Sequence, residues 1–318
     1  FHRIFRPHRV AWWTLVAGLT VTAALGWELH REAVELDRQR LARRVSDIQS
    51  QLDSRVEKSE MLLNNLRDYL RLSGENRRAI LNRWCYDNGL TINCPWVHGI
   101  VVATNKHTPE WRSQFPHPPS KWNGSDWGRL NEIMFKQPVD CEIAFTSSIT
   151  NIKHYLDDYQ LRSYSQAGNR FSRTVKNSRL QMSERQNVML DANKNAIIGT
   201  SFYVPIYSPD LAPMVADAAR LTNTVDYKAL RWLHFKSMIV APIDYDALAG
   251  ALRSDAPTDV EIELFSSTNQ TAETWLSNSN GTPRATDPKF KPYLNHRQLW
   301  LMYGQKHSIY FYTTPLFE

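Results

Sequence analysis

The pattern of apolar and polar positions divides the chain sharply near its N-terminus. The stretch from Val10 to Trp27, VAWWTLVAGLTVTAALGW, contains no charged residue, and charged residues flank it on both sides. A helix that spans a bilayer needs about 20 mostly apolar residues, and Leu29 and the aliphatic part of Arg9 extend the stretch to that length. We therefore expect a transmembrane helix over residues 10–29. A cleaved signal peptide is the alternative, because AALGW has some of the small residues of a cleavage site.

The charges around this stretch predict its orientation. Three arginines precede it, and by the positive-inside rule residues 1–9 stay in the cytoplasm as a short stub. The chain from about residue 30 onward then lies outside the cytoplasm, which for a bacterium means a single pass through the inner membrane and a periplasmic body. The residues expected at the two membrane interfaces are Arg9, Trp12, Trp13 and Trp27.

Residues 30–72 contain no proline or glycine and predict one long helix. Its apolar positions recur at spacings of three and four, a near-heptad seam with one stutter. Two interpretations stay open: the seam pairs two copies of the chain as a dimer stalk, or it packs on the chain's own domain. Both also hold if the first half pairs and the second half packs on the sheet. The seam consists of Leu41, Val45, Ile48, Leu52, Val56, Ser59, Leu63, Leu66 and Leu70.

The remaining residues, 73–318, predict strands separated by helices and then strands in succession. This order is typical of an α+β fold with antiparallel, PAS-like sheets. Two strands are expected to end at Pro205 and Pro242, and a hairpin with Gly304 at its turn is expected to close the chain. A parallel dinucleotide-binding fold is not expected, because IVVATNKHT, the first predicted strand and the turn after it, lacks the glycine-rich turn of that fold.

Composition and motifs narrow the possible functions. The 318 residues are 42% hydrophobic and 22% charged, as in ordinary globular proteins, and the net charge is +6 with scattered basic residues. We expect no nucleic-acid partner, because no basic patch or RNA-binding signature is present. The sequence has no HExxH, GxSxG, P-loop or CxxCH motif. We therefore predict no catalytic residue, no metal site, no cofactor and no enzymatic activity.

The three cysteines are Cys85, Cys94 and Cys141. In an oxidising compartment Cys85 and Cys94 could form a disulfide and leave Cys141 free. The alternative that both residues stay reduced thiols is left open.

Several segments together resemble the CHASE domain of bacterial and plant membrane receptors. In that family an anchor and a long helix precede two PAS-like lobes, so the resemblance implies a two-lobed extracytoplasmic sensory domain over residues 73–318. The segments that carry it are WVHGIVVATNKHTPEWRSQF, SFYVPIYSP, KSMIVAPIDYDALAGAL, DVEIELFSS and HSIYFYTTPLF.

The resemblance also implies a ligand pocket in the lobe far from the membrane. The family's aspartate near the head of a helix corresponds to Asp157 or Asp158, and the end of the following strand corresponds to Ser183. The family's run of small residues between them is missing, so no family ligand carries over. The alternative interpretation of the two aspartates is a solvated helix start. Family receptors also continue into a second span and an output domain, whereas this sequence reaches TTPLFE where that span is expected to begin.

Two functions follow as hypotheses. The first is a single-span, membrane-anchored binding module that serves as sensory input for a small ligand or as a scaffold. The second is an accessory structural subunit of a larger inner-membrane complex, for example respiratory or photosynthetic. The expected partners are the lipid bilayer, other integral membrane subunits or a second copy through the stalk helix, and a small-molecule ligand.

Overall fold

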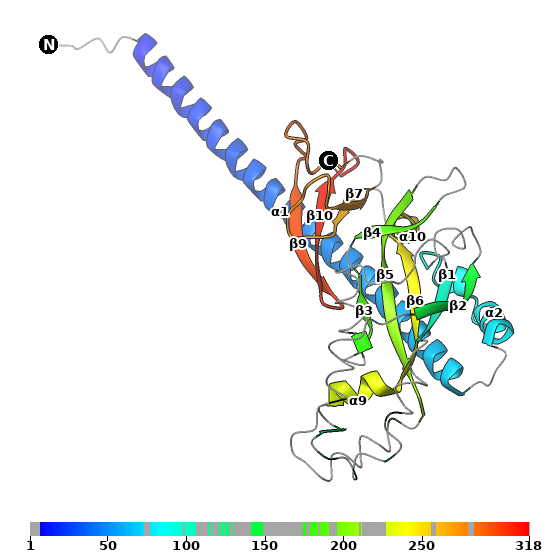
Figure 1. Cartoon of the computed structure of the whole chain (residues 1–318). Helices are drawn as coiled ribbons and strands as arrows, with labels where there is room; N and C mark the ends of the chain where they lie inside the picture. The colour runs from blue at the N-terminus through cyan, green and yellow to red at the C-terminus, as the bar shows by residue number, and fades with distance from the viewer. Residues whose placement is uncertain are drawn as a thin grey trace.

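The computed structural model describes residues 7–72, 77–97, 99–105, 141–148, 179–183, 185–190, 196–209, 227–255, 259–278 and 283–317, together with a few isolated positions (Figure 1). The helices of this part are α1 (Pro7–Leu72), α2 (Arg77–Asp87), α3 (Leu90–Asn93), α9 (Tyr227–His234) and α10 (Tyr245–Asp255). The strands are β1 (Gly99–Asn105), β2 (Cys141–Ser148), β3 (Gln181–Met182), β4 (Gln186–Leu190), β5 (Ala196–Tyr207), β6 (Phe235–Asp244), β7 (Val260–Phe265), β8 (Trp275–Asn278), β9 (Asn295–Met302) and β10 (Gln305–Thr313).

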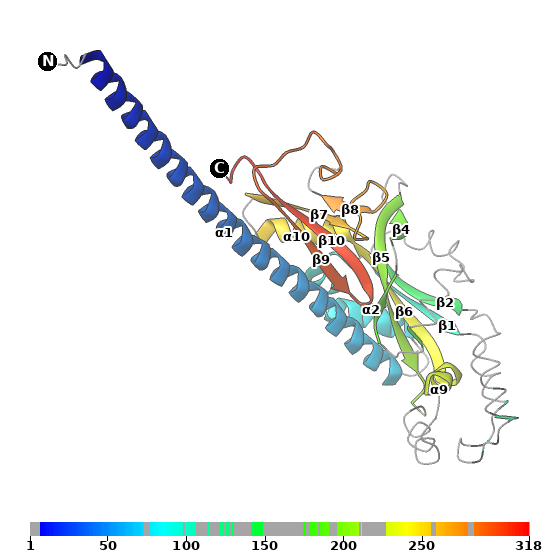
Figure 2. The ribbon, with the colours of Figure 1, turned by 90° about the vertical axis from the view of Figure 1, so that its left-hand side faces the viewer.

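Helix α1 is the longest element, with 66 residues and a length of about 99 Å at 1.5 Å per residue. The predicted span and the predicted stalk are one uninterrupted helix. Its N-terminal half projects away from the rest of the chain, and both sheets lie along its C-terminal half (Figures 1 and 2). A search of the described residues finds no helix with the length and apolar character needed to cross a membrane. The transmembrane prediction for residues 10–29 is therefore not confirmed.

The near-heptad seam of α1 is buried against the chain's own body. All nine of its positions, from Leu41 to Leu70, are inaccessible to solvent, and its apolar members belong to one hydrophobic core with residues of both sheets. Ser59 is the polar member. Its hydroxyl donates to the Arg55 carbonyl at 3.0 Å and accepts the indole N–H of Trp96 at 2.8 Å. Of the two interpretations of the seam, the structure therefore supports packing on the chain's own domain.

The larger sheet, called sheet A here, contains six strands in the order β2-β1-β6-β5-β3, with β4 also paired to β5. Every pairing in it is antiparallel. The central strand β6 is buried along almost its whole length, which is why its sequence FKSMIVAPID reads as a continuous apolar run.

The prediction that Pro205 and Pro242 end their strands is wrong. Strand β5 continues to Tyr207 and β6 continues to Asp244. Proline lacks a backbone N–H and is tolerated where a strand has a free side. The ladder between β1 and β6 stops at Val240, and the next bridge on that side joins Ile243 to Val97, so Pro242 lies in the gap between them. Pro205 likewise lies beyond the stretches of β5 that pair with β3 and β4.

The smaller sheet, called sheet B, has the antiparallel order β8-β7-β10-β9. The predicted closing hairpin is confirmed as β9 and β10, joined by a two-residue turn with positive φ at Tyr303 (46°) and Gly304 (82°). Within the described ranges, the fold is thus α+β with two antiparallel sheets and a long N-terminal helix, which confirms the predicted class at that level.

Candidate functional site

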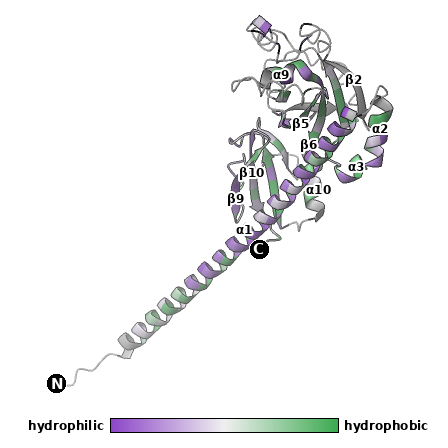
Figure 3. Ribbon diagram, turned by 90° about the horizontal axis from the view of Figure 1, so that it is seen from below, coloured by the Kyte–Doolittle hydropathy of each residue, from purple (hydrophilic) through white to green (hydrophobic). Residues whose placement is uncertain are grey.

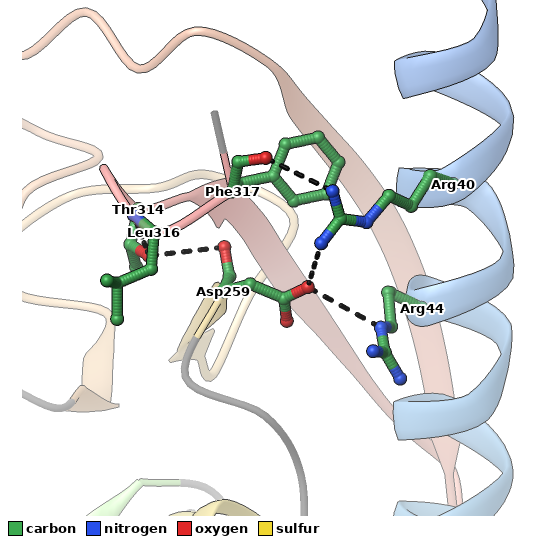
Figure 4. A network of polar contacts seen from close by, with 6 residues as sticks. All are labelled: Arg40, Arg44, Asp259, Thr314, Leu316 and Phe317. Carbon is green, nitrogen blue, oxygen red and sulfur yellow. Dashed lines mark hydrogen bonds and ion pairs between the residues drawn. The ribbon is translucent and has the colours of Figure 1, made fainter.

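Polar contacts join the two sheets to α1. The contact with the most charged groups lies at the point where α1 first reaches the sheets. Asp259 immediately precedes β7, and its Oδ2 atom lies 3.1 Å from a guanidinium nitrogen of Arg40 and 3.6 Å from one of Arg44. Arg40 also donates to the carbonyl of Phe317 at 3.2 Å, and its guanidinium carbon lies 4.5 Å from the centre of the Phe317 ring. Figure 4 shows these residues, which we call the α1–C-terminal junction.

The C-terminal segment is held to the same aspartate through its backbone. The Thr314 amide donates to the Asp259 carbonyl at 2.9 Å, and the Thr314 hydroxyl donates to the same oxygen at 3.3 Å. The Thr314 hydroxyl in turn accepts the amide of Leu316 at 3.3 Å, and the Phe317 amide donates to the Thr314 carbonyl at 2.9 Å. One residue, Asp259, therefore connects α1, sheet B and the segment that follows β10.

The charges of the junction are unequally solvated. The Asp259 side chain is 8% exposed, whereas those of Arg40 and Arg44 are 48% and 35% exposed. Within the described part of the chain, the second carboxylate oxygen of Asp259 is buried and has no hydrogen-bond partner. The carboxylate therefore depends on the two arginines for compensation, whereas each arginine keeps part of its contact with water.

A second contact joins the hairpin turn to α1 and to sheet A. The Tyr303 hydroxyl donates to a carboxylate oxygen of Glu60 at 2.5 Å, and the Tyr303 ring lies edge-to-face on Phe202 of β5 with ring centres 5.3 Å apart. Burial raises the pKa of Tyr303 far above its ordinary value, and the hydrogen bond to Glu60 raises this pKa further. The phenol therefore stays a donor. The hairpin turn at Tyr303 therefore connects sheet B to α1 and to sheet A.

These contacts join segments that are distant in sequence. They consist of ion pairs, hydrogen bonds and ring contacts. Among the residues that the structure describes, no group of three or more histidine, cysteine, aspartate or glutamate side chains could hold a metal ion. The predictions of no enzymatic activity and no cofactor stay predictions.

The structure places the predicted site residues apart from this junction. Asp157 and Asp158 lie outside the described residues. Ser183 is buried beside β3, where its amide donates to the Ser201 carbonyl and its hydroxyl accepts the Ser201 amide, both at 2.8 Å. It extends the β3–β5 pairing by one residue. A ligand role for these three residues stays a prediction.

No disulfide joins Cys85 to Cys94 in the described part of the chain, and a bridge between these two residues stays a prediction. The Cys94 side chain is buried against α1, where its sulfur lies 3.9 Å from the Ser59 hydroxyl. Burial raises the pKa of the Cys94 thiol, so the neutral form is favoured.

Among the residues predicted at the membrane interfaces, Trp12, Trp13 and Trp27 are all exposed on α1. Arg9 lies in the first turns of α1, and its side chain is not among those described.

Sequence reasoning missed the junction almost entirely. Arg40 and Arg44 are one helical turn apart, which is a signal for a shared partner, but many charged pairs on α1 have that spacing. Asp259 is the first residue of DVEIELFSS, where the local pattern predicts only the start of a strand. Its partners on α1 are 215 to 219 positions away in the sequence, so no local pattern connects them.

Comparisons with known proteins give little further information. No model of a protein family matches the chain, and no curated protein matches it. The resemblance to the CHASE domain therefore stays a prediction. Among solved structures, the chain is similar to the periplasmic sensory domain of the Campylobacter jejuni chemoreceptor Tlp1, with a TM-score of 0.38 and 7% sequence identity over 87% of this chain and 92% of that one. At that score and identity the similarity does not establish a shared fold.

Proposed function

We propose that the chain is a single-span, membrane-anchored extracytoplasmic module that binds a small ligand or a partner and passes the effect into α1. Residues 10–29 form the anchor in this proposal, and the two sheets form the binding body. The observation that carries it is the apolar, fully projecting start of α1. Leucine, valine and tryptophan side chains there are exposed. In the ribbon of Figure 3, hydrophobic (green) residues in this part of α1 come ahead of a hydrophilic (purple) stretch.

A helix that is apolar on every side is stable when a membrane or another protein covers it. The polar side chains of this segment are compatible with lipid, because they are satisfied inside the helix. Thr14, Thr20 and Thr22 donate to backbone carbonyls three or four residues earlier, at 2.8 to 2.9 Å. Such bonds remove the cost of an unpaired hydroxyl in hydrocarbon.

The sensory part of the proposal is supported by how α1 contacts the body. The buried seam packs on sheet A and on sheet B, and the α1–C-terminal junction and the Tyr303–Glu60 contact hold it from the side. A rearrangement within either sheet therefore changes contacts of the same helix that continues into the apolar segment. The long helix is the route by which binding in the body affects the membrane.

The anchor is tested by extracting native membranes at alkaline pH. We expect the chain to stay with the membrane pellet, and Leu19→Arg to shift a large part of it to the supernatant, because an arginine near the middle of a span costs about 3 kcal/mol. Leu36→Arg is the matched control, an equally exposed leucine of α1 outside the proposed span. Release of the unaltered chain, or equal effects of the two substitutions, contradicts the anchor.

A second candidate function is an accessory subunit of a membrane complex. It is favoured by the open helix surface at Gly18 and Gly26, where an added Cβ atom meets nothing within 4 Å, so another helix could approach the backbone closely. Purification from native membranes in mild detergent separates the two functions. Stable co-migration with other integral proteins supports the subunit. Migration without them, together with ligand-induced thermal stabilisation, supports the sensory module.

A further inference from the structure

Residues 283–294, which lead into β9, are attached to the outer face of sheet B. Glu263 of β7 is buried, and its two carboxylate oxygens accept the backbone amides of Arg284 and Ala285 at 2.7 and 2.9 Å. The Arg284 guanidinium carbon lies 5.6 Å from the centre of the Phe290 ring. These contacts place the first part of the loop, from residue 283 onward, on the sheet.

The next residues alternate between inward and outward positions. Phe290 packs edge-to-face on Tyr312, with ring centres 4.9 Å apart. Its neighbours Lys289 and Lys291 are both exposed, and the Lys289 amide donates to the Asp287 carboxylate at 2.8 Å. The loop therefore exposes two lysines that are two residues apart in the sequence.

The loop lies close to the projecting half of α1. The Tyr293 hydroxyl donates to the Asp37 carboxylate at 3.0 Å. Asp37 follows Leu29, the end of the proposed span, by eight residues, or about 12 Å along the helix. The headgroup layer reaches about 5 to 7 Å beyond the hydrocarbon. The distance left between the headgroups and the level of Asp37 is therefore within one Debye length, which is about 8 Å in physiological salt.

The C-terminal segment adds an apolar residue at the same end of the body. Leu316 is 72% exposed, and its neighbour Phe317 is held by Arg40, only three residues further along α1 than Asp37. Figures 1 and 2 show the C-terminus beside α1 at the point where the helix leaves the body. Exposed apolar residues next to cationic ones are typical of surfaces that rest on lipid headgroups.

We propose that this end of the body docks on anionic lipid headgroups through Lys289 and Lys291, with Tyr293 and Leu316 at the interface. The inference rests on the proposed anchor and adds to it a second contact with the membrane, which sets the tilt of the body. The ligand is the surface of an anionic lipid bilayer, and each lysine contributes by its attraction to the lipid phosphates.

The test uses the full chain reconstituted in two kinds of vesicles, one of phosphatidylcholine alone and one containing phosphatidylglycerol. Flotation reports insertion of the anchor, and hydrogen exchange of the amides in 284–294 reports docking. We expect flotation with both lipids, and exchange in this loop about fivefold slower or more with the anionic lipid. The slowing should disappear in Lys289→Gln/Lys291→Gln.

Lys306→Gln is the matched control. Lys306 is an exposed lysine of the same sheet, but it lies near the Tyr303 turn, which contacts α1 at Glu60, about 46 Å beyond Leu29. This control should keep the lipid-dependent slowing. If the protein floats with both lipids but the amides of 284–294 exchange equally fast in both, the docking is overturned and the anchor stands. Loss of flotation with both lipids overturns the anchor and the docking together. Equal effects of the control and the double substitution also contradict docking at this loop.

Discussion

At the scale of single residues, the α1–C-terminal junction shows how unequal burial decides what a charge contributes. Asp259 is buried and its two arginines are half-exposed. Removing the acid leaves two solvated cations, whereas removing the cations leaves an uncompensated buried carboxylate. The two changes break the same ion pairs but differ in cost.

We predict that Arg40→Gln/Arg44→Gln lowers the free energy of unfolding by about 3 kcal/mol, and that Asp259→Asn lowers it by only about 1 kcal/mol. Urea unfolding followed by circular dichroism measures both. Arg38→Gln is the control, because its pairing with Glu35 at 3.8 Å is fully on the surface and contributes less than about 0.5 kcal/mol. Equal losses in the acid and base variants would refute this account of the junction.

The buried tyrosines predict an alkaline limit to stability. Burial raises the pKa values of Tyr245, Tyr303 and Tyr312 above the ordinary value of 10.0. The unfolded chain therefore releases these protons at a lower pH than the folded chain does. Their contribution is complete below about pH 10 and decreases as the pH rises above it.

We expect the free energy of unfolding to fall as the pH rises from about 10 to about 11, and to fall less steeply in Tyr303→Phe. One proton changes the slope by at most about 1.4 kcal/mol per pH unit, and partial exposure of Tyr303 reduces this further. Denaturant titrations at a series of pH values measure the slope, with Tyr86→Phe, an exposed tyrosine, as control. An unchanged slope in Tyr303→Phe would show that its proton is not linked to folding.

At the scale of elements, α1 is one helix whose two parts differ in the distribution of their apolar residues. Its first part is apolar and exposed, and its second part has a narrow apolar seam that is buried on its own domain. The seam spacing was predicted from sequence, but a near-heptad pattern is the same for a coiled coil and for a helix lying on a sheet. Only the position of β5 and β10 beside it distinguishes the two.

The seam should therefore determine stability and not oligomeric state. Leu63→Ala should lower the free energy of unfolding by about 2 to 5 kcal/mol, because it removes fully buried methyl groups and leaves a cavity. Met61→Ala, two residues away and exposed, should cost less than about 0.5 kcal/mol. Analytical ultracentrifugation in detergent checks the mass of both variants. A change of oligomeric state in Leu63→Ala alone would favour the dimer stalk.

At the scale of the whole molecule, the two sheets share α1 as a common wall. Residues of the seam, sheet A and sheet B form one continuous core, and the Tyr303 turn touches Glu60 and Phe202 at once. Neither sheet buries its inner face without the helix. The two sheets share no strand, but they pack with α1 around one core and therefore form a single unit.

We predict that both sheets unfold together. In native-state hydrogen exchange at rising urea, the slowest amides of β6 and β10 should converge on the same free energy of opening. Leu52→Ala, a change in the shared wall, should lower both values by the same amount within about 0.5 kcal/mol. Loss of protection in only one of the two strands would show that the lobes are independent.

Features that depend on neighbouring residues along the chain could be predicted from the order of residues. The long helix, the seam positions, the α+β class and the hairpin turn at Gly304 were predictable, because each is set by residue spacing or by the backbone freedom of a few adjacent residues. Tertiary structure alone decided what depends on which segments meet. It selected the chain's own sheets as the partner of the seam, allowed prolines inside β5 and β6 where a ladder had stopped, and brought Asp259 to Arg40 and Arg44. Contacts between residues hundreds of positions apart leave no periodic trace in sequence, since only the folded chain places their charges and apolar faces together.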